Sequence, residues 1–128
     1  IAEDDRLIQN LTVRQVSKYD CDVFTAENGK EALELLEQTQ IDLLITDYFM
    51  PKMSGEDLIK EVRRGDQALP IIALTAATIG SEAEILRQAG ADIVLAKPYD
   101  KRKFEAAMDS LIRNGRFSIA GETRPKLA

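Results

Sequence analysis

The feature that most restricts the fold is a short, almost continuously apolar run over residues 41–46, which ends at Asp47. Only Asp42 interrupts the run, and it contains the β-branched residues Ile41, Ile45 and Thr46. This pattern predicts a strand buried on both faces, as in the middle of a parallel sheet. Open α/β sheets place their chemistry at the carboxyl ends of such strands. Asp47 is therefore a candidate functional residue, although a turn-capping role would also explain it.

Similar runs alternate with helical patterns along the whole chain. Strands are expected at 22–26, 70–74 and 93–96, and residues 1–2 have the character of the end of a strand whose beginning is absent. Helical patterns begin near residues 7, 28, 55, 81 and 100. This alternation predicts an α/β fold, a doubly wound parallel sheet with helices on both faces. Right-handed crossovers then place the carboxyl ends of all strands at one edge.

The apolar stripes of two helices indicate which residues face the sheet. The last helix has the clearest stripe: Phe104, Ala107, Met108, Leu111 and Ile112. A weaker stripe runs along the first helix: Leu7, Ile8, Leu11 and Val16. After residue 114 the periodicity ends. We therefore expect one domain over residues 1–114, followed by a C-terminal tail or linker at 115–128.

Composition limits the possible functions. With 128 residues, of which 45% are hydrophobic, the chain is long enough for one buried core. The net charge of -5 argues against direct nucleic-acid binding. The single cysteine suits a reducing compartment, and we find neither a signal-peptide pattern nor an apolar run of membrane-spanning length. A cytoplasmic, soluble domain without membrane contact is expected. The absence of histidine excludes histidine-based catalysis and a phospho-histidine on this chain.

Polar residues stand at the ends of four expected strands: Glu3 with Asp4, then Asp47, Thr75 and Lys97. Three carboxylates at one edge repel one another unless a cation lies among them, and oxygen ligands favour Mg²⁺. A carboxylate beside such a cation can act as a nucleophile and form an acyl phosphate. The Thr75 hydroxyl and the Lys97 ammonium could stabilise charge on a phosphoryl group.

Each of these residues also has an ordinary structural explanation. Glu3 and Asp4 could be helix N-terminal acids favoured by the helix dipole. Thr75 could be a plain β-branched strand end, and Lys97 a solvated lysine. Four independent coincidences at one edge of one sheet are improbable, so the combined pattern favours a functional site.

These residues together resemble the receiver domain of two-component response regulators and hybrid sensor kinases, over about residues 1–112. The similarity rests on the acidic pair, the T-D-x-x-M-P-x-x-x-G motif from Thr46 to Gly55, Thr75, the A-G-A motif at 89–91, and Lys97-Pro98. The resemblance implies a flavodoxin-like fold, a five-stranded parallel sheet in the order 2-1-3-4-5, here with most of the first strand missing.

The resemblance also implies a role for each site residue. Asp47 would be the phosphoacceptor, with Thr75 as the switch hydroxyl and Lys97 as the lysine that pairs with the phosphoryl group. The metal ligands would be Glu3, Asp4, Asp47 and the backbone carbonyl of Phe49, with Glu3 acting through water. The bond from Lys97 to Pro98 would be cis. Mg²⁺ would be the cofactor, and the phosphoryl donor a phospho-histidine of a histidine kinase or histidine phosphotransfer domain.

The chain departs from the family pattern at Val94, where an aromatic partner for the switch threonine is common. The opening acids and Val94 favour a hybrid-kinase receiver over a stand-alone regulator, and either would catalyse its own phosphorylation and dephosphorylation. Two other classes remain open. A haloacid-dehalogenase-like phosphatase would need an acid at the position of Phe49, and a receiver fold could also be a phosphorylation-independent binding module.

Overall fold

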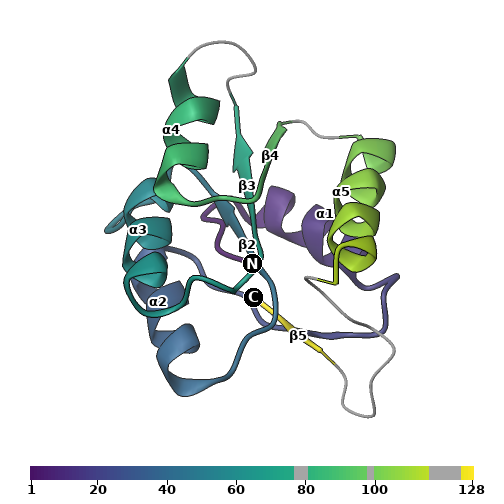
Figure 1. Ribbon diagram of the computed structural model, residues 1–128, viewed down its shortest axis with the longest axis horizontal. Helices are drawn as coiled ribbons and strands as arrows, with labels where there is room; N and C mark the ends of the chain where they lie inside the picture. Colours follow the sequence, from purple (N-terminus) through teal and green to yellow (C-terminus); the bar gives the residue numbers. More distant parts are fainter. Residues whose placement is uncertain (77–80, 98–99, 116–124) are drawn as a thin grey trace.

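The computed structural model describes residues 1–76, 81–97, 100–115 and 125–128. Over these residues, helices alternate with short strands, and every strand pairing is parallel (Figure 1). The helices are α1 (Arg6–Val16), α2 (Gly29–Gln38), α3 (Gly55–Gly65), α4 (Ser81–Ala89) and α5 (Lys101–Arg113). The strands are β1 (Asp22–Val23), β2 (Leu44–Asp47), β3 (Ile71–Thr75), β4 (Ile93–Ala96) and β5 (Lys126–Leu127). The predicted α/β class is confirmed.

Polar side chains determine where several helices begin. Asn28 accepts a hydrogen bond from the Glu31 N–H at 2.9 Å, and its side-chain amide donates to the Glu31 carboxylate. Ser54 and Asp100 likewise accept from backbone N–H groups in the first turns of α3 and α5. These contacts satisfy N–H groups that have no partner within the helix. The Ser54 and Asp100 caps mark where the chain becomes helical again after Asp47 and after Lys97.

The strands form two ladders that isolated bridges connect. Strands β2, β3 and β4 lie in that order in one ladder, and β1 pairs with β5 in the other. Ala2 bridges to both Ala26 and Thr46, and Leu127 pairs with both Val23 and Leu43. The row that contains Ala2 and β5 therefore lies between β1 and β2. Ala2 and β5 therefore occupy the position expected for the first strand. This arrangement places β2 and Asp47 in the middle of the sheet.

Helices cover both faces of the sheet (Figure 1). The α2, α3 and α4 helices pack on one face with Leu44, Ile71 and Ala73, whereas α1 and α5 pack on the other with Ile45 and Ile72. Neighbouring residues of β2 and of β3 thus enter opposite cores, as alternation along a strand requires. This double burial explains why the run at 41–46 is apolar almost throughout.

Two expectations were wrong in part. In α1 the residues with buried side chains are Thr12 and Val16, whereas Leu7 and Leu11 are 69% and 48% exposed. The buried face thus differs from the predicted stripe except at Val16, and Thr12 can be buried because its hydroxyl donates to the Ile8 carbonyl at 3.0 Å. The end of the expected tail also differs, because residues 125–128 lie within the sheet.

Candidate functional site

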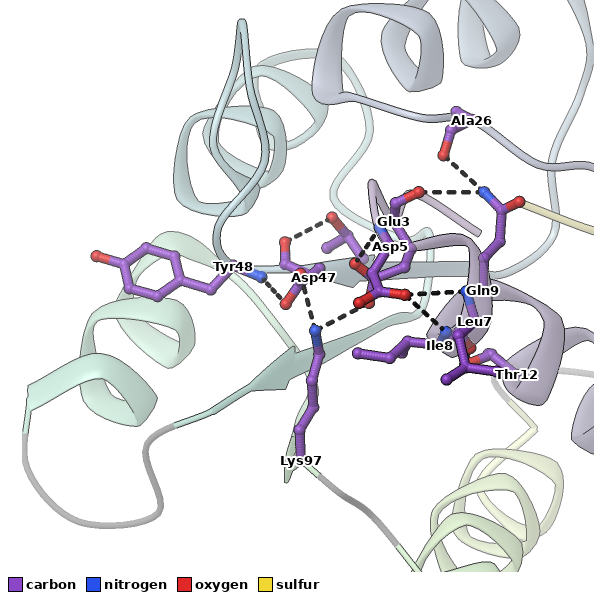
Figure 2. A network of polar contacts seen from close by, with 11 residues as sticks. Glu3, Asp5, Leu7, Ile8, Gln9, Thr12, Ala26, Asp47, Tyr48 and Lys97 are labelled. Atoms are coloured by element: carbon purple, nitrogen blue, oxygen red, sulfur yellow. Dashed lines mark hydrogen bonds and ion pairs between the residues drawn. The ribbon is translucent and has the colours of Figure 1, made fainter.

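Asp47 lies at the carboxyl end of β2, in the middle of the sheet, and is 6% exposed. Its Oδ1 accepts a hydrogen bond from the Tyr48 N–H at 2.8 Å, and its Oδ2 lies 2.9 Å from Nζ of Lys97 (Figure 2). Each carboxylate oxygen therefore has a donor that fixes its orientation. The side chain of Tyr48 points away from the carboxylates, which leaves only its backbone in this network (Figure 2).

Lys97 follows β4, and its ammonium lies between two carboxylates (Figure 2). Nζ is 2.9 Å from Oδ2 of Asp47 and 2.9 Å from Oε1 of Glu3. Burial lowers the pKa of Lys97, but the hydrogen bonds and charges of Asp47 and Glu3 outweigh it and raise the pKa overall. The lysine is thus held in its charged form beside Asp47, as pairing with an anion requires.

Glu3 is 1% exposed, and its environment is unusual for a carboxylate. Burial, supported by the nearby charge of Asp47, raises its pKa to about 7, although Lys97 acts in the opposite direction. Within the described part of the chain, Oε1 of Glu3 has the Lys97 ammonium as its ion-pair partner but makes no hydrogen bond of good geometry. A second cation near this oxygen would relieve that deficit.

The carboxylates of Glu3, Asp4 and Asp47 can each offer an oxygen, and these oxygens lie within 4.8 Å of one another. Asp4 is exposed, whereas the other two are buried. An all-oxygen donor set, open to solvent on one side and with an unsatisfied buried oxygen, fits a hard divalent ion such as Mg²⁺. These three residues fit the metal that the sequence led us to expect. The expected fourth ligand, the carbonyl of Phe49, stays a prediction.

Thr75 ends β3 and is 1% exposed. Its hydroxyl donates to Oε2 of Glu82, in the first turn of α4, at 2.5 Å. The sequence interpretation missed Glu82, because first-turn acids are common for reasons of the helix dipole alone. Val94 lies in β4, paired with Ala73 of β3. The expected cis bond before Pro98 lies outside the described residues.

The loop after Asp47 returns directly to the aspartate. The Gly55 N–H donates to the Tyr48 carbonyl at 2.7 Å. A Cβ at Gly55 would lie 2.0 Å from the carbonyl oxygen of Asp47. Only glycine allows this approach, so the last position of the motif is a packing requirement that holds the loop against the site.

Comparison with known proteins gives consistent matches. A sequence model of the family described as "Response regulator receiver domain" matches residues 1–109. The transcriptional regulatory protein CpxR of Klebsiella pneumoniae is 32% identical over 123 residues, which are 96% of this chain and 52% of that protein. The chain spans about half the length of the curated relatives it matches.

Solved structures agree in fold. The receiver domain of the Francisella response regulator 1452 has a TM-score of 0.80 and 26% identity, covering 89% of this chain and 94% of that one. The receiver domain of sensor histidine kinase PA1611 from Pseudomonas aeruginosa has a TM-score of 0.79 and 25% identity, with 88% and 93% covered. That structure has a magnesium ion coordinated in its active-site cleft.

Among the described residues, no helix combines the length and apolar character that a membrane span needs. The family match covers most of the chain and includes the strand-end residues Glu3, Asp4, Asp47, Thr75 and Lys97. The flavodoxin-like arrangement of parallel strands agrees with the solved receiver domains. The chain belongs to the response regulator receiver domain family.

Proposed function

We propose that Asp47 accepts a phosphoryl group from a phospho-histidine on another domain, as part of two-component signalling. The observation that carries this proposal is the pairing of Asp47 with the Lys97 ammonium at 2.9 Å, beside two further carboxylates. A buried acid with a fixed cation and a cluster of oxygen ligands is suited to phosphoryl transfer, in which catalysis consists largely of positioning and charge stabilisation.

In the proposed step, an oxygen of Asp47 forms a bond to phosphorus while the bond between phosphorus and the histidine nitrogen breaks. The electron pair of that bond returns to the imidazole, and the product on this chain is an acyl phosphate. Lys97 exchanges part of its contact with the aspartate for a phosphoryl oxygen. Mg²⁺ held by Glu3, Asp4 and Asp47 would supply the remaining charge neutralisation.

The phosphoryl donor must be a different domain, because this chain contains no histidine. A histidine kinase or a histidine phosphotransfer domain has the required chemistry. The exposed Leu7 and Leu11 lie four residues apart on α1, the helix that follows the acidic pair, and support an apolar protein contact near the site. The net charge of -5 disfavours direct DNA binding by this domain, and a cytoplasmic location suits such partners.

The longer protein that we propose is a response regulator with an output domain. CpxR, which is called a transcriptional regulatory protein, supports this assignment. The expectation of a hybrid histidine kinase finds no support among the curated relatives, although one similar structure is the receiver domain of a sensor kinase. A phosphatase function has no support either, since Phe49 stands where a general acid would be needed and its side chain is 66% exposed.

Intact-mass measurement after incubation with acetyl phosphate and Mg²⁺ tests the proposal. We expect one phosphoryl adduct on the parent chain and none on Asp47→Asn, which keeps the shape but removes the nucleophile. Asp57→Asn is the matched control, because Asp57 is an exposed aspartate in the first turn of α3. An adduct of equal yield on Asp47→Asn would contradict the assignment.

A further inference from the structure

The peptide bond between Glu3 and Asp4 joins two of the three carboxylate residues of the site, so its orientation helps to decide where both side chains lie. The Glu3 N–H still donates to the Ala26 carbonyl at 3.0 Å, as part of the sheet. The side chain of Asp5 already caps α1 by accepting from the Leu7 N–H at 2.9 Å. The peptide between the two acids is therefore the link at which the hydrogen bonds of the sheet end and those of the helix begin.

The side chain of Gln9 reaches back from α1 to this peptide (Figure 2). Its Nε2 donates to the Glu3 carbonyl at 3.2 Å and to the Ala26 carbonyl at 3.1 Å. A glutamine amide nitrogen has two N–H groups, so each carbonyl can receive one of them. The Glu3 carbonyl is also the carbonyl of the peptide that joins Glu3 to Asp4. Gln9 therefore holds the plane of the peptide between the two acids.

The Glu3 carbonyl requires such a donor because of its burial. Glu3 is 1% exposed, so water has little access to its backbone. A buried carbonyl without a hydrogen-bond donor costs free energy comparable to a lost hydrogen bond. The same Gln9 nitrogen also bonds to Ala26 on the neighbouring strand position, which ties the peptide to the sheet. Rotation of the peptide plane would break this contact and take the buried carbonyl away from its donor.

The two acids differ in how firmly their carboxylates are held. Oε1 of Glu3 lies 2.9 Å from Nζ of Lys97, and its Oε2 accepts from the Asp5 N–H at 3.3 Å. Asp4, by contrast, is exposed. The position of the Asp4 carboxylate therefore depends mainly on the backbone that carries it, and this backbone begins at the peptide that Gln9 holds.

We propose that Gln9 is a positioning residue for the metal site: its amide fixes the peptide between the two acids and so keeps the Asp4 carboxylate within the three-carboxylate cluster. The inference rests on the proposed function, in which Glu3, Asp4 and Asp47 hold Mg²⁺. Rotation of the peptide would move Asp4 away from the cluster. Asp47 and Lys97 lie at the ends of other strands and would keep their 2.9 Å contact. Loss of the Gln9 amide should thus weaken metal binding more than it impairs the nucleophile.

Gln9→Met tests this role, because methionine is similar in length and volume to glutamine but has no N–H donor. Titration with Mg²⁺, followed by backbone amide shifts, measures metal affinity without phosphorylation. We expect binding about tenfold weaker than in the parent, the lower end of the loss seen when a group that orients metal ligands is removed. Gln15→Met is the matched control, because Gln15 lies on the same helix and its amide oxygen accepts from Lys18 at 3.2 Å. This control should bind Mg²⁺ as the parent does.

Phosphorylation by acetyl phosphate separates positioning from a general loss of structure. In Gln9→Met the Mg²⁺ concentration for half-maximal rate should rise by more than the rate at saturating Mg²⁺ falls. Gln9→Ala, which also lacks the donors and adds no bulk, should show the same pattern, so the test does not depend on one substitution. Parent-like Mg²⁺ affinity in both variants, or a fall in the saturating rate alone, would overturn the positioning role. A parent chain that binds no Mg²⁺ would overturn the metal site itself, and this inference with it.

Discussion

The hydroxyl of Thr75 donates a hydrogen bond to Oε2 of Glu82 at 2.5 Å, which connects the end of β3 to the first turn of α4. A threonine that responds to a phosphoryl group on Asp47 must exchange this acceptor for a phosphoryl oxygen. Both acceptors are charged, so the two hydrogen bonds are similar in strength, about 1.5–3 kcal/mol each. Glu82 therefore opposes the switch, and helix α4 is coupled to it.

Glu82→Ala should make the phosphorylated state easier to reach. Removing the competing acceptor should tighten binding of the phosphate mimic beryllofluoride by up to about tenfold, which corresponds to the lower end of that hydrogen-bond energy. Titration followed by fluorine NMR measures the affinity. Glu84→Ala is the control on the same helix, because the contacts of Glu84 are with Arg87 and Gln88. Unchanged affinity in Glu82→Ala would show that the contact does not restrain Thr75.

Thr75→Ala should still be phosphorylated but should lose the response of α4. The nucleophile and its lysine remain, whereas the group that links phosphorylation to Ser81–Ala89 is removed. Backbone amide shifts with and without beryllofluoride measure the response. We expect shifts in α4 of the parent that are absent in the variant, and no movement of the Val94 side chain in either. Matching α4 shifts in both proteins would exclude Thr75 as the relay.

Mg²⁺ should stabilise the parent, because it relieves repulsion among Glu3, Asp4 and Asp47. Asp4→Ala should lose most of the rise in melting temperature that Mg²⁺ produces. The neighbouring acid provides a control, since the side chain of Asp5 caps α1 by accepting from the Leu7 and Ile8 N–H groups. Asp5→Ala should cost about 1 kcal/mol of stability yet keep its response to Mg²⁺. Equal Mg²⁺ responses in Asp4→Ala and the parent would contradict the metal site.

Stability without metal should depend on pH through Glu3. Its folded-state pKa is about 7, compared with an ordinary 4.5, so between these values the folded chain holds a proton that the unfolded chain has released. The contribution of Glu3 to the unfolding free energy is therefore largest below pH 4.5 and falls as pH rises towards 7.

Comparison with Glu3→Gln isolates the titration of Glu3, because the other titratable side chains are the same in both proteins. In urea titrations with a chelator, the parent should lose stability relative to Glu3→Gln as the pH rises from about 5 to about 8, because Glu3 releases its proton in the folded chain over this range. Added Mg²⁺ should reduce the loss. A difference that is constant with pH would mean that Glu3 titrates normally.

Most of the fold could be predicted from local pattern. The apolar run before Asp47, the cap residues and the alternation of strands with helices are local signals, and they predicted the α/β class and the strand-end positions of Asp47, Thr75 and Lys97. Connection rules then placed these ends at one edge. That is why the site residues could be named before their distances were known.

The tertiary structure decided what depends on contacts between residues distant in sequence. The partner of Thr75 is Glu82 only because α4 packs back beside β3, and the orientation of α1 depends on packing that periodicity alone did not specify. Residues 125–128 lack enough length to show a strand pattern, and only the tertiary structure shows that β5 pairs with β1 and that Leu127 bridges to Leu43. Local sequence determined which elements form, whereas the burial of polar backbone determined which segments pair.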